Sequence, residues 1–505
     1  YLDFMQGDIS YDATYDWRAV GNNYTSTLGK QQGNIIQNQH TLGITGGLNF
    51  ETIWAKKSWY TKYQDDLNAY KQDVSEYATK YQEKADKKKK NKKGSRKVEA
   101  KGYKHHLSGR DYLYGLASSL KQVQLNFNVD RSTIIPGIMK DPGFFGVGSG
   151  GSPTLGFVLG SQADIRAQAI QEQWVSSAAL TDPYQKRKGR SFNYTASLEP
   201  LSDLKIEITG QNEYQNDMQQ YGFNIDPTAY ESQRGNFSTT SWAFNSFTKS
   251  DVLFDKLRDN ALSVANRISG SNGSTFPTGY GIAHQGVLME ALLKTYGGTD
   301  REKPVSSIPL PNWSLSYSGL TNNRYLNKWF NRIDLTHAYR STYSAVGIET
   351  EVDYISNPNG NGMDANNNYL APIRYDNITF VETFAPLIGV DMTMRNNLQV
   401  RFMYNRDRVQ SFSFTNYSLT DQQTNEFQFG LGYVFKDMKL NMRYRGKKKT
   451  IKGDMTLRSD LIMRDTETSI LRLIEDDAQI TAGDKQFSLK TTLDYKLSQN
   501  FTLMF

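Results

Sequence analysis

Apolar and polar residues alternate along much of the chain, and this period of two constrains the fold more than any other feature of the sequence. Residues 9–17 read Ile-Ser-Tyr-Asp-Ala-Thr-Tyr-Asp-Trp, so every second side chain is apolar. Successive side chains of a β-strand point to opposite faces of a sheet, so this pattern predicts strands with one apolar and one polar face. The same alternation returns at 42–50, 123–129, 192–198, 204–208, 313–317, 333–339, 398–404, 427–435 and 487–497.

The C-terminal third reads as a nearly continuous meander of hairpins. Polar turn residues separate its strands, as is typical of short hairpin connections. The predicted turns are Arg395-Asn396-Asn397, Lys436-Asp437 and Ser498-Gln499-Asn500.

A soluble β-sandwich or β-helix would show the same period, but three features favour a membrane wall. The strands often run 9–13 residues, long enough to cross a bilayer at a tilt. Their apolar phase is rich in aromatics, and the chain holds 31 Tyr and 25 Phe although its mean hydropathy is only −0.63. Their polar phase carries charges such as Arg401, Arg458 and Asp460, which would be costly in a dry core. We therefore predict an all-β fold, a large transmembrane antiparallel β-barrel with helical insertions that forms part of a bigger single-chain barrel.

The alternation assigns side chains of the meander to two environments. A shift of one residue would exchange the two sets, so the pattern predicts the register strongly. We expect the interior, lumen-facing set to be Gln399, Arg401, Gln428, Lys439, Asn441, Arg443 and Lys490. We expect the lipid-facing set to be Phe402, Phe429, Leu440, Met442 and Leu489.

Two segments interrupt the strands and divide the chain. Apolar residues from Trp59 to Tyr81 recur at helical spacing, and a second helical pattern begins near Lys249. We predict barrel strands at 1–50, a helical Lys-rich insertion at 51–110 and strands at 111–248 with a Gly-rich loop at 132–188. A helical insertion between strands at 249–308 and a barrel meander at 309–505 follow. The chain opens and closes within strand-like sequence, so we expect an internal piece, truncated before the true C terminus.

The lysine run at 84–101 has two interpretations. It could form an electrostatic patch for acidic headgroups, polyanions or a partner. The interpretation that we favour is a solvated helix end that frays, which is how blocks of like charge usually behave. No aromatic residues interleave with these lysines, so we predict no nucleic-acid binding.

No constellation of residues points to catalysis, a metal or another cofactor. The five His residues lack metal-site spacing, and Cys is absent. The glycine run at 146–151 lacks the Lys-Ser/Thr pair of a phosphate loop. The segment beginning at Asp364 starts like a calcium loop but has Tyr369 where the loop needs Gly. We predict no enzymatic activity, no metal and no cofactor.

Several short motifs, in order, resemble the SprA (Sov) family, the outer-membrane translocon of the Type 9 protein secretion system. Each motif is modest, and the specificity lies in their order along nearly the whole chain. The lysine-rich segment after Tyr81 has no counterpart in the family pattern. The motifs are Ile135-Pro136-Gly137, Gly143-Phe144-Phe145-Gly146, residues 156–166, Ala265-Asn266-Arg267, residues 308–313, residues 335–341, Pro386-Leu387-Ile388-Gly389 and residues 454–497.

The resemblance implies a very large barrel in the outer membrane of a Bacteroidota-type Gram-negative cell that exports folded cargo proteins. It also implies a PorV-like lipid-embedded barrel subunit and a periplasmic plug protein as partners, beside membrane lipids. A pore of that width needs a gate, which residues 249–308 or separate subunits would supply. The alternative is an outer-membrane nutrient transporter or an adhesin barrel.

The Gly-rich loop is the candidate partner contact. Its phenylalanines at Phe144, Phe145 and Phe157 stand among flexible glycines, and apolar groups on a loop usually need a cover. The other interpretation is that these residues pack inside the rim of the same chain.

Overall fold

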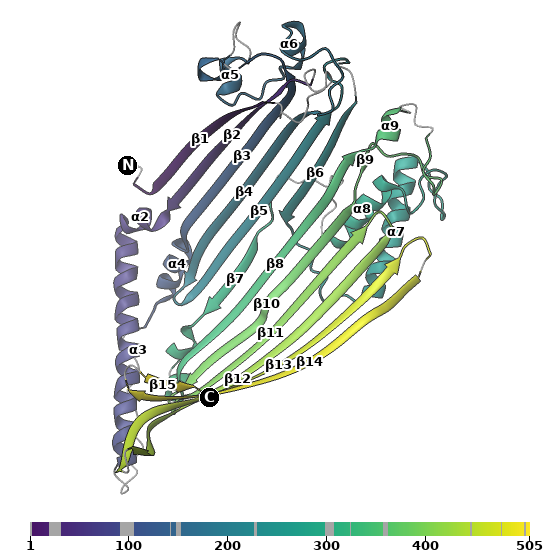
Figure 1. Ribbon diagram of the computed structural model, residues 1–505. Coiled ribbons are helices and arrows are strands. Elements are labelled where there is room, and N and C mark those ends of the chain that lie inside the picture. The colour runs from purple at the N-terminus through teal and green to yellow at the C-terminus, as the bar shows by residue number, and fades with distance from the viewer. Residues whose placement is uncertain are drawn as a thin grey trace.

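The computed structural model describes residues 3–19, 32–90, 106–141, 143–147, 153–226, 230–297, 308–323, 325–356, 362–444, 447–475, 477–498 and 501–504. These residues build one large antiparallel sheet that carries helical insertions (Figure 1).

The sheet contains fifteen strands, and along its main path almost every strand pairs with its neighbours in sequence. Its outer strands are β1 and β15, so the described residues form an open sheet. The strands are β1 (Met5–Arg18), β2 (Asn34–Asn49), β3 (Leu120–Ile138), β4 (Tyr184–Leu201), β5 (Leu204–Gln220), β6 (Glu231–Thr240), β7 (Asn312–Tyr317), β8 (Phe330–Thr350), β9 (Ile373–Arg374), β10 (Asn377–Met394), β11 (Leu398–Ser413), β12 (Ser418–Tyr444), β13 (Lys447–Arg472), β14 (Asp477–Ser498) and β15 (Phe501–Met504).

Strands β6 and β7 lie end to end between β5 and β8 and together fill one strand position of the sheet. Both pair with β5 on one side and β8 on the other, β6 with their upper halves and β7 with their lower halves. The chain leaves the sheet after Thr240 and returns at Asn312, and the Leu310 amide donates to the Thr240 carbonyl at 3.0 Å. The intervening insertion therefore emerges from the middle of a strand rather than from a hairpin turn.

The helices lie at the two ends of the sheet. In Figure 1, α5 and α6 lie at the top, α7–α9 lie on the right, and α2–α4 lie on the left. No helix within the described ranges combines the length and the apolar character needed to cross a bilayer. The helices are α2 (Phe50–Ala55), α3 (Ser58–Lys90), α4 (Gly109–Ala117), α5 (Leu155–Val158), α6 (Arg166–Gln171), α7 (Ser250–Ser269), α8 (Gln285–Tyr296) and α9 (Val352–Ser356), with 3-10 turns η1 (Phe144–Gly146), η2 (Gly319–Asn322) and η3 (Leu326–Lys328).

Buried apolar side chains gather where the insertions pack on the sheet. The largest cluster joins α7 and α8 to β6, β8, β10, β11 and the ends of β12 and β13. A second joins residues 157–180 to β2 and β3, and a third lies between α3 and its neighbours around Tyr63 and Leu67. Among the described residues, no second layer covers most of the sheet (Figure 1).

The predicted antiparallel strands and helical insertions are confirmed, while closure into a barrel stays a prediction. Two details are wrong. Lys436-Asp437 is no turn, because β12 continues through it as a bulge in which Asp437 takes a positive φ of 55°. The Gly-rich loop spans 139–183 rather than 132–188, because β3 continues to Ile138 and β4 begins at Tyr184.

Gly33 is expected to tolerate no side chain. Its φ is +65°, and a Cβ there would lie 2.5 Å from the backbone carbon of Gly137. Gly270, at the end of α7, has a similar φ of +70° but open space around it. Gly270→Ala should therefore cost about 1–2 kcal/mol for the left-handed conformation alone, and Gly33→Ala about 1–3 kcal/mol more for the clash. Denaturant unfolding of both variants checks this, and equal losses would contradict it.

Candidate functional site

Strand register assigns the side chains of the sheet to two faces. Residues directly opposite each other in antiparallel strands project to the same face. Arg401 pairs with Asp391 and with Gly430, Gly430 with Asp460, and Asp460 with Lys490. These residues share what we call the polar face. Their sequence neighbours project to the opposite, apolar face, where Phe402 pairs with Phe429, Phe429 with Leu461 and Leu461 with Leu489.

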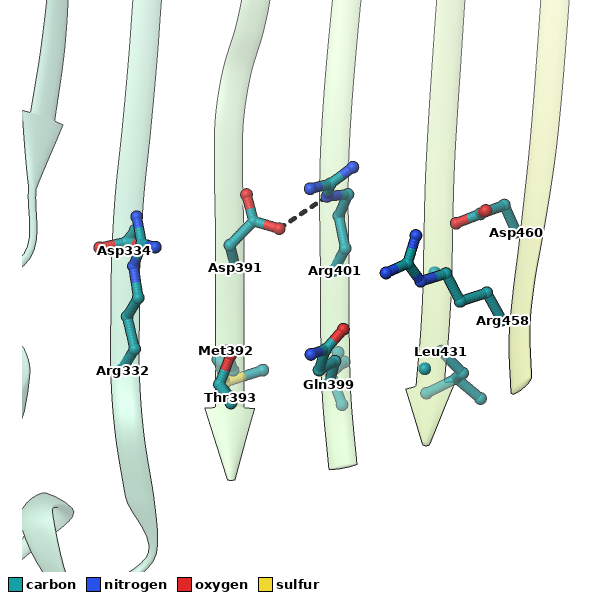
Figure 2. A pocket seen from close by; sticks show the side chains of 13 residues that line it. Arg332, Asp334, Asp391, Met392, Thr393, Gln399, Arg401, Leu431, Arg458 and Asp460 are labelled. Carbon is teal, nitrogen blue, oxygen red and sulfur yellow. Dashed lines mark hydrogen bonds and ion pairs between the residues drawn. The ribbon is translucent and has the colours of Figure 1, made fainter. Parts of the chain in front are cut away.

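The polar face carries a shallow pocket of 420 Å³ that crosses β8, β10, β11, β12 and β13 (Figure 2). Arg401 Nε donates to Asp391 at 2.6 Å, and Arg332 is ion-paired with Asp334. Cations and carboxylates alternate across the strands with no apolar layer over them, an arrangement suited to contact with water. The charged residues that line the pocket are Arg332, Asp334, Asp391, Arg401, Arg458 and Asp460.

The predicted interior residues lie together on the polar face as far as their side chains are described. Gln399 and Arg401 line the pocket, and Gln428 pairs with Met403 in the next row. Lys490 pairs with Asp460, and Lys439 lies beyond the β12 bulge, paired with Lys452. The side chains of Asn441 and Arg443, and of Leu440 and Met442 from the other set, lie outside the described ones. That this face lines a lumen stays a prediction.

The apolar face is exposed over much of its area. Phe402, Phe429 and Leu489, which we predicted to share one environment, do lie on this face. Ile9 is 74% exposed, Phe487 72% and Leu489 69%. Contiguous apolar surface on this scale is rare on soluble monomers and marks contact with a partner or a membrane.

The exposed apolar residues form a continuous band. The band is nine residues long on β12, β13 and β14, which matches the 9–11 residues of a tilted strand that crosses a bilayer, and it is seven residues long on β1–β4 and β11. We call this surface the apolar band. It consists of every second residue, the one on the apolar face, within 5–11 of β1, 42–48 of β2, 123–129 of β3, 192–198 of β4, 398–404 of β11, 427–435 of β12, 455–463 of β13 and 487–495 of β14.

The upper boundary of the apolar band rises along the strands from β14 to β1. On β14 and β13 the first polar pair above the band is Lys485 with Asp465. The residues that pair with Lys485 and Asp465, strand by strand across the sheet, lead to Met5 on β1. Met5 lies at the bottom of the band on β1, whereas the upper boundary of the band on this strand lies near Ala13. Such a climb is what strands tilted against a flat layer produce.

The α7–α8 insertion packs on the apolar face above the band and is fixed there by a buried ion pair. Arg408 and Asp421 are almost fully buried, and Arg408 Nε donates to Asp421 at 2.9 Å. Arg408 also donates to the carbonyls of Asn245 and Thr248, where the insertion begins. The sequence reasoning missed this pair. The sequence does contain a signal for it, because Arg408 stands at a position of β11 where the alternation calls for an apolar residue.

Aromatic side chains cluster on the same face where the insertion leaves the sheet. Tyr339 stacks on Trp313 with ring centroids 4.5 Å apart and on Phe244 at 5.0 Å. Trp242 and Phe384 extend the cluster. Phe244 remains 52% exposed. Tyr and Trp gather at the water interface of membrane proteins, and this cluster lies at the upper edge of the apolar band.

The Gly-rich loop packs on the apolar face above β1–β4. Phe157, predicted as an exposed partner contact, is 1% exposed in the core beside Trp174, so that prediction is wrong. The Asn38 side chain donates to the Phe157 carbonyl at 2.8 Å and holds this turn on the sheet. Phe144 is 86% exposed, and the side chain of Phe145 lies outside the described ones.

An ion-paired arginine joins this loop to the strands. Arg166 pairs with Asp164 and Glu231 at 2.6 Å each, and hydrogen bonds from Arg166 lower the pKa of Asp164. Burial raises the pKa of the adjacent Tyr184 to about 12. The described residues of the loop therefore form a cap that hydrogen bonds and ion pairs attach to the strands.

The remaining motifs show no reactive geometry in the described residues. Asp364 Oδ1 accepts from the amides of Asn366 and Asn368 at 2.8 Å, as in a surface turn. Across the described ranges, no three His, Asp or Glu residues lie close enough to hold a metal ion. Helix α3 confirms the predicted helix from Trp59, and its buried stripe includes Tyr63, Leu67 and Val74. The lysine side chains of 84–90, and residues 91–105, lie outside the description.

Searches against models of known protein families and against curated proteins find no match to the chain. The resemblance to the SprA family therefore stays a prediction.

Proposed function

We propose that this chain is part of the wall of a large outer-membrane β-barrel and that its polar face lines the channel through which the Type 9 secretion system exports folded proteins. The observation that carries the proposal is the separation of the two faces from β1 to β14. Within the apolar band, no bulge moves the apolar residues of a strand to the polar face.

Lipid is the cover that best fits the apolar face. A second sheet could cover it in a β-sandwich, but a stacked sheet would have to extend across the whole band and fit beneath the α7–α8 insertion and the cap. The length of the band, its sloping boundary and the aromatic cluster at its edge all fit a bilayer crossed by tilted strands. An open edge could not persist in lipid, because its backbone groups would lack partners. The sheet must then close with further strands.

Water is the medium that best fits the polar face. The exposed ion pair between Arg401 and Asp391 and the open charged pocket would be costly in a dry interior. Gly430 and Gly432 add no side chain among these charges, and the resemblance to SprA implies a wide channel. A wide pore of this kind suits a macromolecular cargo, and the ordered motifs that resemble SprA support protein export over nutrient uptake or adhesion.

A wide channel needs closure from outside this wall. The sequence left residues 249–308 as one possible gate, but α7 and α8 pack on the apolar face, away from the proposed channel. Separate subunits are the remaining route. We carry over the PorV-like barrel subunit and the periplasmic plug protein as the proposed partners.

Photo-cross-linking tests the export function. A benzophenone amino acid replaces Gln428, on the polar face, or its neighbour Phe429, on the apolar face, in the full-length protein in cells that secrete. We expect secreted proteins to cross-link at position 428 and not at 429. The nutrient-transporter and adhesin alternatives predict no secreted protein at either position, and that outcome with a correctly inserted protein would contradict export.

A further inference from the structure

Three basic residues lie side by side on the apolar face directly above the apolar band. Arg131 of β3 pairs with Lys188 of β4, and Arg190 lies one row lower, paired with Val129. We call Arg131, Lys188 and Arg190 the basic cluster. Like charges directly opposite each other destabilise a sheet, so the arrangement needs a compensating anion.

No carboxylate of the described residues supplies that charge. None of the three cations has an ion pair there, and Arg190 makes only a 3.5 Å hydrogen bond to Asn212. The carboxylates above the cluster on this face, Asp164 and Glu231, are both paired with Arg166.

Polar side chains and a fourth cation surround the cluster, because Lys186 lies one row above Lys188 and donates to the Gln162 carbonyl at 2.7 Å. His40 flanks Arg131 and its Nδ1–H donates to the Gly160 carbonyl at 2.7 Å, while Asn216 pairs with Lys188. Arg131 Nε is buried without a hydrogen-bond partner. A buried N–H group without an acceptor, beside two further cations, can bind an oxyanion.

We propose that the basic cluster binds the phosphate of an anionic lipid headgroup. The proposal rests on the proposed membrane wall. Below the cluster, the apolar band begins with Leu42 and Val129 and continues to the partly exposed Ile44 and Leu125, which would contact the acyl chains of the same lipid. A free phosphate would gain nothing from that apolar surface, so a lipid is the better occupant.

Lipid affinity tests the site. Native mass spectrometry of the full-length protein in detergent measures binding of phosphatidylglycerol and of phosphatidylcholine with the same acyl chains. We expect the double variant Arg131→Gln/Lys188→Gln to bind phosphatidylglycerol about tenfold more weakly. The matched control is Arg187→Gln, which removes a charge from the adjacent residue on the polar face, where Arg187 is ion-paired with Asp217 at 2.9 Å. The control should retain the wild-type affinity.

Unchanged affinity in the double variant, an equal loss in the control, or full competition by inorganic phosphate would each overturn the lipid site. A spin label at Leu489→Cys in lipid bilayers separates this failure from failure of the wall. If the label is accessible to oxygen but not to a water-soluble nickel chelate, the wall stands whatever the fate of the lipid site. If the nickel chelate reaches the label, the proposed wall itself fails.

Discussion

Phe429→Arg is expected to destabilise the protein in a lipid bilayer by about 1–3 kcal/mol, because an arginine on the lipid face of a barrel costs about 2–4 kcal/mol at the bilayer midplane and less toward the interface. Phe429 lies in the upper half of the apolar band on β12, between Phe402 and Leu461, and is 41% exposed. An arginine there has no acidic neighbour on its face and would have to reach past the row of Phe427 to water.

The matched control is Gln428→Arg, one residue away on the polar face. There the new charge would lie near Glu426, which already accepts a hydrogen bond from Gln428 at 2.6 Å, so we expect little change. Guanidinium unfolding in lipid vesicles measures both. Similar losses for the two variants would contradict the assignment of faces.

Arg408→Met is expected to destabilise the attachment of the α7–α8 insertion by about 3–5 kcal/mol, because it leaves the buried carboxylate of Asp421 without its partner. Asp421 is 0% exposed in its side chain, and the Asn245 and Thr248 carbonyls would lose their donor as well. Limited proteolysis of residues 241–311 and denaturant unfolding give the readout.

The double variant Arg408→Met/Asp421→Leu tests the cause. Removing both charges avoids the unpaired carboxylate, so the double variant should be more stable than Arg408→Met alone. The control Arg401→Met breaks an ion pair that is largely exposed on the polar face, where we expect a change of no more than about 1 kcal/mol. If Arg408→Met is no worse than this control, the buried pair does not anchor the insertion.

The strands and the phase of their faces could be predicted from the sequence because alternation is a local property. Arg401 and Phe402 are neighbours of opposite character, and a strand must separate them. Turn residues are also a local signal, and they located the hairpin at Arg395-Asn396-Asn397, where Asn397 takes a positive φ of 66°.

Long-range features could not be predicted in this way. A polar pair such as Lys436-Asp437 fits a turn and a bulge equally well, and only pairing with β13 decides between them. The split of one strand into β6 and β7 depends on β5 and β8, which flank both pieces. Burial of Phe157 depends on Trp174 and on β2 and β3, which contact it from elsewhere in the chain.

Thiol accessibility along β11 tests the two-faced wall most directly. The sequence contains no cysteine, so each single substitution at positions 399–405 adds the only thiol of this chain. The full-length protein, in outer-membrane vesicles, is treated with a charged maleimide that does not enter lipid. The account predicts rapid labelling at 399, 401, 403 and 405 and protection at 400, 402 and 404. Uniform labelling, or protection at 401 with labelling at 402, would contradict it.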